Sequence, residues 1–225
     1  MKLKIIKSLL IPTLGITLST TTISSLTSCT NNNEIKNYLI GGSTQLSGIE
    51  GKAGLDNNQW KLYLNEKEVT NNITWKIEDN NSNVIDGISV DNGTVSWSNS
   101  IAAKDYYFYI IATHDGIKVK SAQIKLTISK YILNGGSTEL IGTQDLNGSD
   151  NESWQLSLDG KQITQSITWK TEDNNGGAIS GISVNGGIVS WVADMNTGEY
   201  YFYVIATYDG LEIKSPLIKL KIVDV

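Results

Sequence analysis

Hydrophobic and polar residues alternate along most of the chain after residue 37, most clearly in the segment 106–113. One parity of this segment carries Tyr106, Phe108, Ile110 and Ala112, and the other carries Tyr107, Tyr109, Ile111 and Thr113. A period of two places alternate side chains on opposite faces of a β-strand. Segments 60–64 and 73–77 show the same period, and no segment after residue 30 shows a helical stripe. The pattern therefore predicts an all-β chain.

The alternating segments occur twice, because the sequence repeats itself after a shift of 94 residues. This shift carries Trp60 to Trp154, Trp75 to Trp169, Trp97 to Trp191 and Tyr106 to Tyr200. A period of this length is a whole small domain and exceeds the unit of a solenoid repeat. We expect one domain over residues 38–130 and a second over 131–225, joined by a very short linker.

Turn residues separate the predicted strands where a β-hairpin needs them. Asn92-Gly93 and Asp115-Gly116 are pairs that tolerate positive φ, as tight hairpin turns require. In the last strand, Ile117 and Val119 have the opposite parity to Ile124 and Leu126, so an extra residue must be absorbed between them. We predict a β-bulge near Ser121-Ala122, and its counterpart Ser215-Pro216 agrees because proline is tolerated at bulges.

The closing hairpin of each copy resembles that of bacterial immunoglobulin-like and cadherin-like modules. The segment 198–210 reads GEYYFYVIATYDG, it follows Ile-Val-Ser-Trp at 188–191, and the first copy repeats it over 106–116. The resemblance implies two tandem immunoglobulin-like β-sandwich domains of seven or so short strands each, extracellular presentation and a role in adhesion. The chain lacks the inter-sheet cysteine pair of antibody domains. We therefore expect cohesion from burial of Trp75, Phe108 and their counterparts, each worth about 1.5–3 kcal/mol.

The first 28 residues have the layout of a secretory signal peptide. Three lysines lie within the first seven residues, a moderately apolar stretch follows to about Leu18, and small polar residues lead to the only cysteine. The apolar stretch is too short, and too interrupted by Pro12 and Gly15, to read as a spanning helix.

The sequence Leu26-Thr27-Ser28-Cys29 resembles the lipobox of bacterial lipoproteins. The resemblance implies cleavage before Cys29, acylation of its thiol, and a lipid-anchored protein on the outer face of a cell membrane, with residues 29–37 as a tether. Two or more acyl chains bind a bilayer stably, at about 0.8 kcal/mol per buried methylene. The alternative is that Cys29 is an unmodified thiol in the leader. With one cysteine, no intramolecular disulfide can form.

Composition and charge narrow the range of partners. All 18 basic residues are lysine, and asparagine and isoleucine are abundant, which is similar to the usage of AT-rich genomes such as those of mollicutes. The formal net charge is −5, and loss of Lys2, Lys4 and Lys7 with the leader would make the remainder more acidic. Phosphate binding needs clustered cations, and no basic run follows Lys7, so we expect no nucleic-acid partner.

Catalytic constellations are absent from the sequence. The single histidine, His114, falls at a predicted hairpin tip where Tyr208 stands in the other copy, which favours an ordinary loop residue. The repeated segments Glu78-Asp79-Asn80-Asn81 and Glu172-Asp173-Asn174-Asn175 could offer oxygen ligands to calcium, but such turns also form for backbone reasons alone. We predict no enzyme, no cofactor and no metal site.

A binding surface is predicted on the outward parity of the longest strand in each copy. Its residues are Tyr107, Tyr109 and Ile111 in the first copy and Tyr201, Tyr203 and Ile205 in the second. Exposed tyrosine is an amphipathic contact residue that is enriched at interfaces. The alternatives are that these side chains support the sheet by cross-strand packing or cover a contact between the two domains.

These observations favour an adhesion or host-interaction lipoprotein whose partner is a host surface protein or glycan. The main alternative is a passive surface spacer or coat protein without a specific ligand. A solute- or carbohydrate-binding lipoprotein ranks third, because small sandwiches rarely hold a deep pocket.

The anchoring hypothesis predicts that Cys29→Ser leaves an uncut, unlipidated precursor, since serine offers no thiol to the acyl donor. Detergent phase partitioning of the variant beside the wild-type chain measures this. Continued partitioning of the variant into the detergent phase would contradict the hypothesis.

Overall fold

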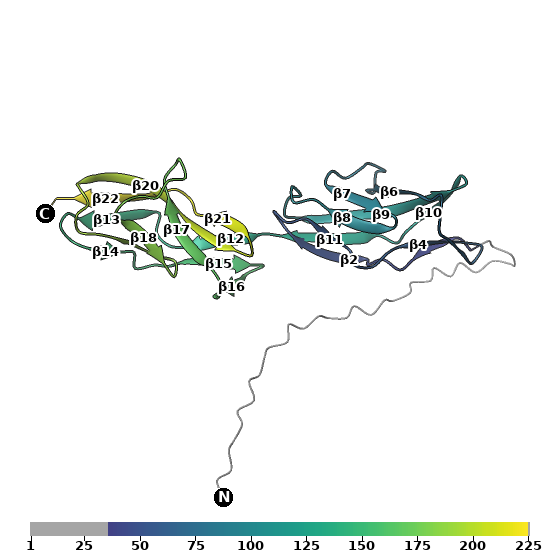
Figure 1. Ribbon diagram of the computed structural model, residues 1–225, viewed down its shortest axis with the longest axis horizontal. Coiled ribbons are helices and arrows are strands. Elements are labelled where there is room, and N and C mark those ends of the chain that lie inside the picture. The colour runs from purple at the N-terminus through teal and green to yellow at the C-terminus, as the bar shows by residue number, and fades with distance from the viewer. Residues whose placement is uncertain (1–35, 225) are drawn as a thin grey trace, which may run out of the picture. The chain divides into compact units, whose positions relative to one another are not determined.

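The computed structural model describes residues 36–224 (Figure 1). The predicted leader 1–28, Cys29 and most of the tether 29–37 lie outside the described residues. Every regular element in the described range is a β-strand, as the alternating pattern predicts. None of the described residues forms a helix long and apolar enough to cross a membrane.

The first module comprises strands β1 to β11. Their bounds are β1 Tyr38–Ile40, β2 Gln45–Ile49, β3 Gly54–Leu55, β4 Lys61–Leu64, β5 Lys67–Val69, β6 Thr74–Glu78, β7 Ile88–Asp91, β8 Thr94–Trp97, β9 Asp105–His114, β10 Ile117–Lys120 and β11 Ile124–Ser129.

The second module comprises strands β12 to β22 and repeats the first element by element. Their bounds are β12 Tyr131–Gly135, β13 Glu139–Thr143, β14 Gly148–Ser149, β15 Trp154–Leu158, β16 Lys161–Ile163, β17 Thr168–Glu172, β18 Ile182–Asn185, β19 Ile188–Trp191, β20 Gly198–Tyr208, β21 Leu211–Lys214 and β22 Ile218–Val223.

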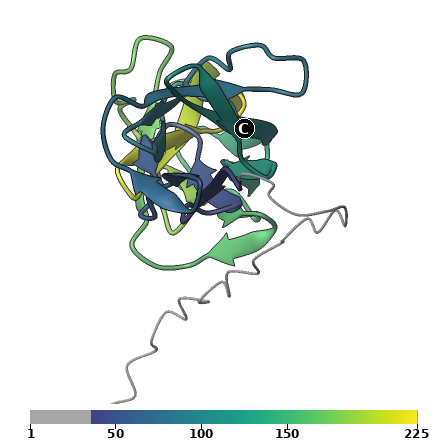
Figure 2. The ribbon, with the colours of Figure 1, turned by 90° about the vertical axis from the view of Figure 1, so that its right-hand side faces the viewer.

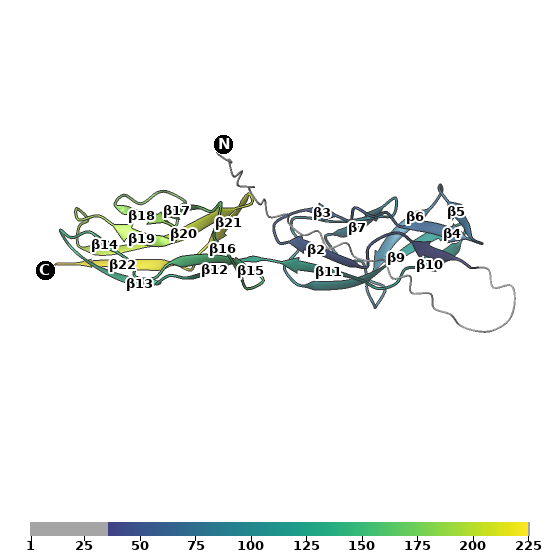
Figure 3. The same cartoon turned by 90° about the horizontal axis from the view of Figure 1, so that it is seen from below.

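Each module is a sandwich of two layers (Figure 3). In the first module, β9 pairs with β6 on one side and with β10 and β11 on the other, and β2 joins β11 in parallel. The other layer contains β1-β4-β5 and β3-β8-β7, which are linked by backbone hydrogen bonds from Asp56 to Val95 and from Trp60 to Gly93. Figure 2 shows the ribbon turned by 90°, so that the strands of the first module are seen roughly end-on.

This strand pairing is typical of an immunoglobulin-like sandwich. One sheet is built around β9 and β10, the two strands of the closing hairpin. In the other sheet, the central strand β8 pairs with its hairpin partner β7. The second module repeats the pattern around β20. The fold is all-β, with two tandem immunoglobulin-like sandwiches, as expected. The buried residues form separate clusters in the two modules, and the domain limits 38–130 and 131–225 stay a prediction.

The core of each module packs aromatic rings against glycine backbone. Phe108 and Phe202 are completely buried. The buried indole of Trp97 covers two glycines, Gly48 and Gly54, and a Cβ added to Gly48 would lie 2.5 Å from its Nε1. Trp60 covers Gly42 in the same way, and Trp154, Trp191 and their glycines repeat the arrangement. Glycine is therefore required where a ring lies directly on the backbone.

Trp75 and Trp169 are less buried than the sequence predicts. Both pack against the core but keep part of the ring exposed, whereas Trp60, Trp97, Trp154 and Trp191 are all at most 7% exposed. The reason is position, because β6 pairs only with β9 and β17 only with β20. A ring on an edge strand lacks a neighbour on one side.

The predicted bulge is confirmed. Strand β10 ends at Lys120 and β11 begins at Ile124, so Val119, Ile124 and Leu126 all face the core. Ser121 fills the gap, since its backbone N–H donates to the Ile110 carbonyl (2.9 Å) and its hydroxyl accepts the Ile110 N–H (2.9 Å). Ser215 makes the same two bonds to Val204, followed by Pro216.

The predicted hairpin turns are also confirmed. Asn92 and Gly93 connect β7 to β8 with φ of 46° and 78°, and Asp115 and Gly116 connect β9 to β10 with φ of 47° and 78°. Two successive residues at positive φ match the right-handed twist of the strands they join.

Burial depth predicts that Phe108→Ala destabilises the first module by about 3–5 kcal/mol, and that Trp75→Ala costs less because part of its ring already contacts water. Urea denaturation of both variants measures the difference in the free energy of unfolding. An equal or larger cost for Trp75→Ala would contradict the edge-strand explanation.

Candidate functional site

The predicted tyrosine surface lies on the outer face of the sheet built around β9. The strand register places Lys76, Ile111 and Lys120 side by side in one row of this face. Neighbouring rows pair Glu78 with Tyr109 and Tyr107 with Lys125. Residues directly opposite each other across a ladder share a face, so the outer face alternates tyrosine with lysine.

Lysine side chains cover part of this face. The Lys120 ammonium lies 3.7 Å from the centroid of the Tyr109 ring, and the Gln123 amide donates to the Tyr109 hydroxyl (3.3 Å). Tyr109 and Ile111 are consequently only half-exposed. A lysine stem can cover apolar surface while its ammonium stays in water, so these two residues contribute mainly to the sheet itself.

Tyr107 is the exposed member of the group, with 44% of its surface accessible. Asp105, two residues before it, accepts hydrogen bonds from the Thr127 hydroxyl (2.7 Å) and from Lys125 (2.8 Å). The bond from Lys125 lowers the pKa of Asp105, and the same contact raises the pKa of Lys125. Tyr107 therefore stands beside a carboxylate that stays ionised.

The second module repeats this arrangement around β20. The Lys214 ammonium lies 3.7 Å from the centroid of the half-buried Tyr203 ring, and Tyr201 is 43% exposed. Glu199 accepts hydrogen bonds from Lys219 and from the Tyr201 hydroxyl, both at 2.6 Å. Lys219 is the larger cause of the lowered pKa of Glu199, and Glu199 raises the pKa of Tyr201.

Ile205 is a correction to the predicted surface. Parity places it beside Tyr203, but its side chain is only 2% exposed. It lies between Lys170 and Lys214 in the sheet register, where long lysine stems flank it. Of the six predicted surface residues, Tyr107 and Tyr201 present the most surface to a partner.

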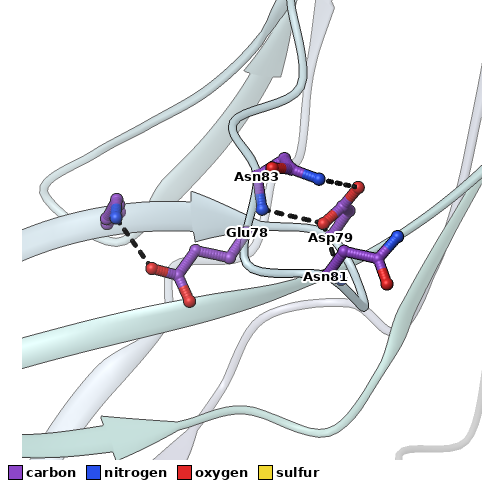
Figure 4. Close-up of polar contacts among 5 residues, drawn as sticks. Glu78, Asp79, Asn81 and Asn83 are labelled. Carbon is purple, nitrogen blue, oxygen red and sulfur yellow. Dashed lines mark hydrogen bonds and ion pairs between the residues drawn. The ribbon is translucent and has the colours of Figure 1, made fainter.

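The carboxylate oxygens of the two acidic loops bond to neighbouring groups of their own module. In the first module, Asp79 Oδ1 accepts the backbone N–H groups of Asn81 and Asn83, both at 2.8 Å, and Glu78 pairs with Lys76 (2.8 Å) (Figure 4). The bond from Asn83 lowers the pKa of Asp79.

Asp173 bonds in the same way to the N–H groups of Asn175 (2.8 Å) and Gly177 (2.7 Å). This is the backbone role that Asx turns perform. Within residues 36–224, no group of three or more histidine, cysteine, aspartate or glutamate side chains is placed to hold a metal ion.

His114 differs slightly from the expectation of an exposed hairpin tip. It is the last residue of β9, its side chain is 19% exposed, and Nδ1 lies 3.2 Å from the Asn72 carbonyl oxygen. Nε2 lies 3.3 Å from the exposed Asp115 carboxylate. The ring thus joins the end of β9 to the loop before β6.

Two buried carboxylates were not predicted from the sequence. Asp56 is 4% exposed, and it accepts the Ser43 N–H (2.8 Å), the Ser43 hydroxyl (2.9 Å) and the Asn58 N–H (3.0 Å). Asp150 makes the same three bonds to Ser137 and Glu152. The sequence contains a signal for this contact, because each Gly-Gly-Ser-Thr segment is followed by an aspartate thirteen residues after its serine. The role is structural, because every bond serves a loop.

Comparisons with known proteins give structural likeness only. No family model matches the chain, and no curated protein matches it. Among solved structures, the I9–I11 tandem of titin matches with a TM-score of 0.43 at 9% identity, covering 84% of this chain and 66% of that one. Mouse cadherin-23 EC22–24 matches with a TM-score of 0.36 at 12% identity, covering 85% and 66%. The tandem Ig repeats of Dlar match with a TM-score of 0.34 at 8% identity, covering 85% and 100%.

The buried carboxylate predicts that Asp56→Ala destabilises the first module by about 1–3 kcal/mol, because the Ser43 and Asn58 donors lose their acceptor. Asp150→Ala should have the same effect on the second module. Thermal unfolding measures both, with the exposed Asp91→Ala as the control. If Asp56→Ala lowers the melting temperature no more than Asp91→Ala does, the loop does not need this carboxylate.

Proposed function

We propose that the chain is an exported lipoprotein, anchored to the outer face of a cell membrane through acylated Cys29, whose two modules bind a protein or glycan on a host surface. The leader 1–28 and the segment Leu26-Thr27-Ser28-Cys29 support export and lipid attachment. The acidic chain without clustered cations argues against a nucleic-acid partner.

The observation that carries the adhesive role is the exposed tyrosine that both modules hold at the same position. Tyr107 and Tyr201 each expose more than two fifths of their surface, and each is flanked by a lysine–carboxylate pair. A tyrosine ring offers apolar contact area and a hydroxyl at low conformational cost. Two such sites on one chain would add their effects on a partner surface by multivalency.

A passive spacer is the second candidate, and a specific observation favours it. Lys120 and Lys214 lie over the Tyr109 and Tyr203 rings, so half of the predicted tyrosines stabilise their own sheet. If Tyr107 and Tyr201 serve the same purpose, the modules would extend from the membrane and bind nothing specifically.

We further propose that the chain has no catalytic activity. The proposed acylation uses its one thiol, the ring of its one histidine contacts the Asn72 carbonyl, and Asp79 and Asp173 bind the N–H groups of their own loops. No nucleophile paired with a base is left among these groups.

The adhesive role predicts that Tyr107→Ser combined with Tyr201→Ser reduces attachment of the chain to host cells or extracellular matrix, with nearly unchanged melting temperature. Exposed anchor aromatics contribute more to association than to folding. Adhesion assays and thermal unfolding of the same preparations test this.

The matched control is Tyr109→Ser combined with Tyr203→Ser. These rings contact lysines within the sheet, so their loss should lower stability by about 0.5–1 kcal/mol per module and leave attachment intact. Attachment that survives Tyr107→Ser with Tyr201→Ser would reject the adhesive role of this face and favour the spacer.

A further inference from the structure

The outer face of the sheet β1-β4-β5 carries two stacked tyrosines. The Tyr38 and Tyr63 rings lie nearly parallel, with 5.1 Å between their centroids and 6° between their planes. These two residues stand opposite each other in the strand register, whereas their neighbours Leu39 and Leu62 pair on the core side. Tyr38 is 38% exposed, and Ile40, two residues further along the same face, is 41% exposed. We call the surface formed by Tyr38, Ile40 and Tyr63 the β1 face.

The charged residues beside the β1 face neutralise each other. Lys61 stands opposite Ile40 and forms an ion pair with Glu68 (3.0 Å). Glu68 also accepts a hydrogen bond from the Tyr63 hydroxyl (3.1 Å), and the bond from Lys61 is the main cause of its lowered pKa. A partner can therefore bind this face through apolar contact without supplying a counter-charge.

The second module lacks this face, although it builds the same sheet. In β12-β15-β16 the three positions hold Ile132, Asn134 and Ser157. The core side keeps leucine at both positions, and Leu133 and Leu156 are buried. The sheet therefore forms without the aromatic pair, so folding alone does not account for the pair in the first module.

The β1 face lies next to the segment that leads to the proposed anchor. Tyr38 is the first residue of β1, and Asn37 Oδ1 accepts the Asn65 N–H (3.1 Å), which ties the start of β1 to the turn after β4. Residues 30–37 separate Cys29 from this strand, and even when fully extended they reach at most about 30 Å. Such a short tether keeps the face at a high effective concentration beside the bilayer, so even a weak contact is occupied.

We propose that the β1 face rests on the bilayer that holds the chain, with the Tyr38 and Tyr63 rings at the level of the lipid headgroups. This inference rests on the proposed acylation of Cys29. Tyrosine concentrates at membrane–water interfaces because its ring is apolar and its hydroxyl is polar, and Ile40 adds apolar contact. The two layers of a sandwich face in opposite directions, so this contact directs Tyr107 away from the bilayer.

The test uses the acylated chain, with its isoleucine methyl groups isotopically labelled, in phosphatidylcholine nanodiscs that contain a small fraction of gadolinium-chelating lipid. NMR then measures how strongly the disc surface relaxes each methyl signal. We expect the Ile40 methyl to relax several-fold faster than those of Ile132 and Ile141, which are exposed in the second module. Neutral lipid suffices because the charges beside the β1 face are already paired.

Tyr38→Ile combined with Tyr63→Ser gives the first module the residues of the second and keeps Ile40 as the probe. Relaxation of the Ile40 methyl should fall several-fold, because the tether alone lets the module move away from the bilayer. Unchanged methyl signals of the buried Ile110 and Ile128 show that the variant keeps its fold.

The matched control makes the reverse change in the second module, with Ile132→Tyr and Ser157→Tyr combined, and it should leave relaxation of the Ile40 methyl as in the wild type. Relaxation that the first-module variant leaves unchanged would overturn the proposal, because the tether would then explain the proximity. An Ile40 signal that changes with the number of chains per disc would also overturn it, since the face would then bind a second copy.

The same preparations separate this contact from the anchor on which it rests. A chain that does not co-elute with the nanodiscs rejects both the acylation of Cys29 and the contact of the β1 face. Co-elution with slow relaxation of the Ile40 methyl rejects the contact alone.

Discussion

The fold of each module depends on the contact between a buried indole ring and glycine backbone. Trp97 lies on Gly48 of the opposite layer and on Gly54 of the neighbouring strand in its own sheet, and Trp191 lies on Gly142 and Gly148 in the same way. Antibody domains join their two layers with a disulfide, which this chain cannot form because it has one cysteine. A large ring pressed against bare backbone provides the inter-layer contact instead. Within residues 36–224, the buried indole N–H groups of Trp60, Trp154 and Trp191 have no hydrogen-bond acceptor, so hydrophobic burial is what stabilises these rings.

The bulge at Ser121 and Ser215 determines which surfaces the modules offer. By absorbing the change of parity, it keeps Val119 and Ile124 in the core and leaves Lys120 and Lys125 on the outer face. The lysines then lie beside the tyrosines of β9. The same device in the second module places Lys214 and Lys219 beside Tyr203 and Tyr201. One local irregularity thereby produces a mixed tyrosine–lysine face on both modules.

Because the module is duplicated, its two copies can be compared with each other. Features that both copies keep, such as the Asp56 and Asp150 loops and the Asp79 and Asp173 turns, serve the fold. The Asp79 and Asp173 carboxylates accept N–H groups of their own turns, and the Asp56 and Asp150 carboxylates accept N–H groups that include one from a second loop of the same module.

The sequence by itself determined the all-β class, the duplication, the two hairpin turns and the bulge, because strand period, positive-φ residues and parity are local properties of the chain. It also predicted which parity of β9 faces outward. It could not predict that Ile205 is buried, that Trp75 lies on an edge strand, or that Asp56 and Ser43 meet. Those facts depend on which strands become neighbours. Only the tertiary structure decided them, since burial and hydrogen bonding are set by residues distant in the sequence.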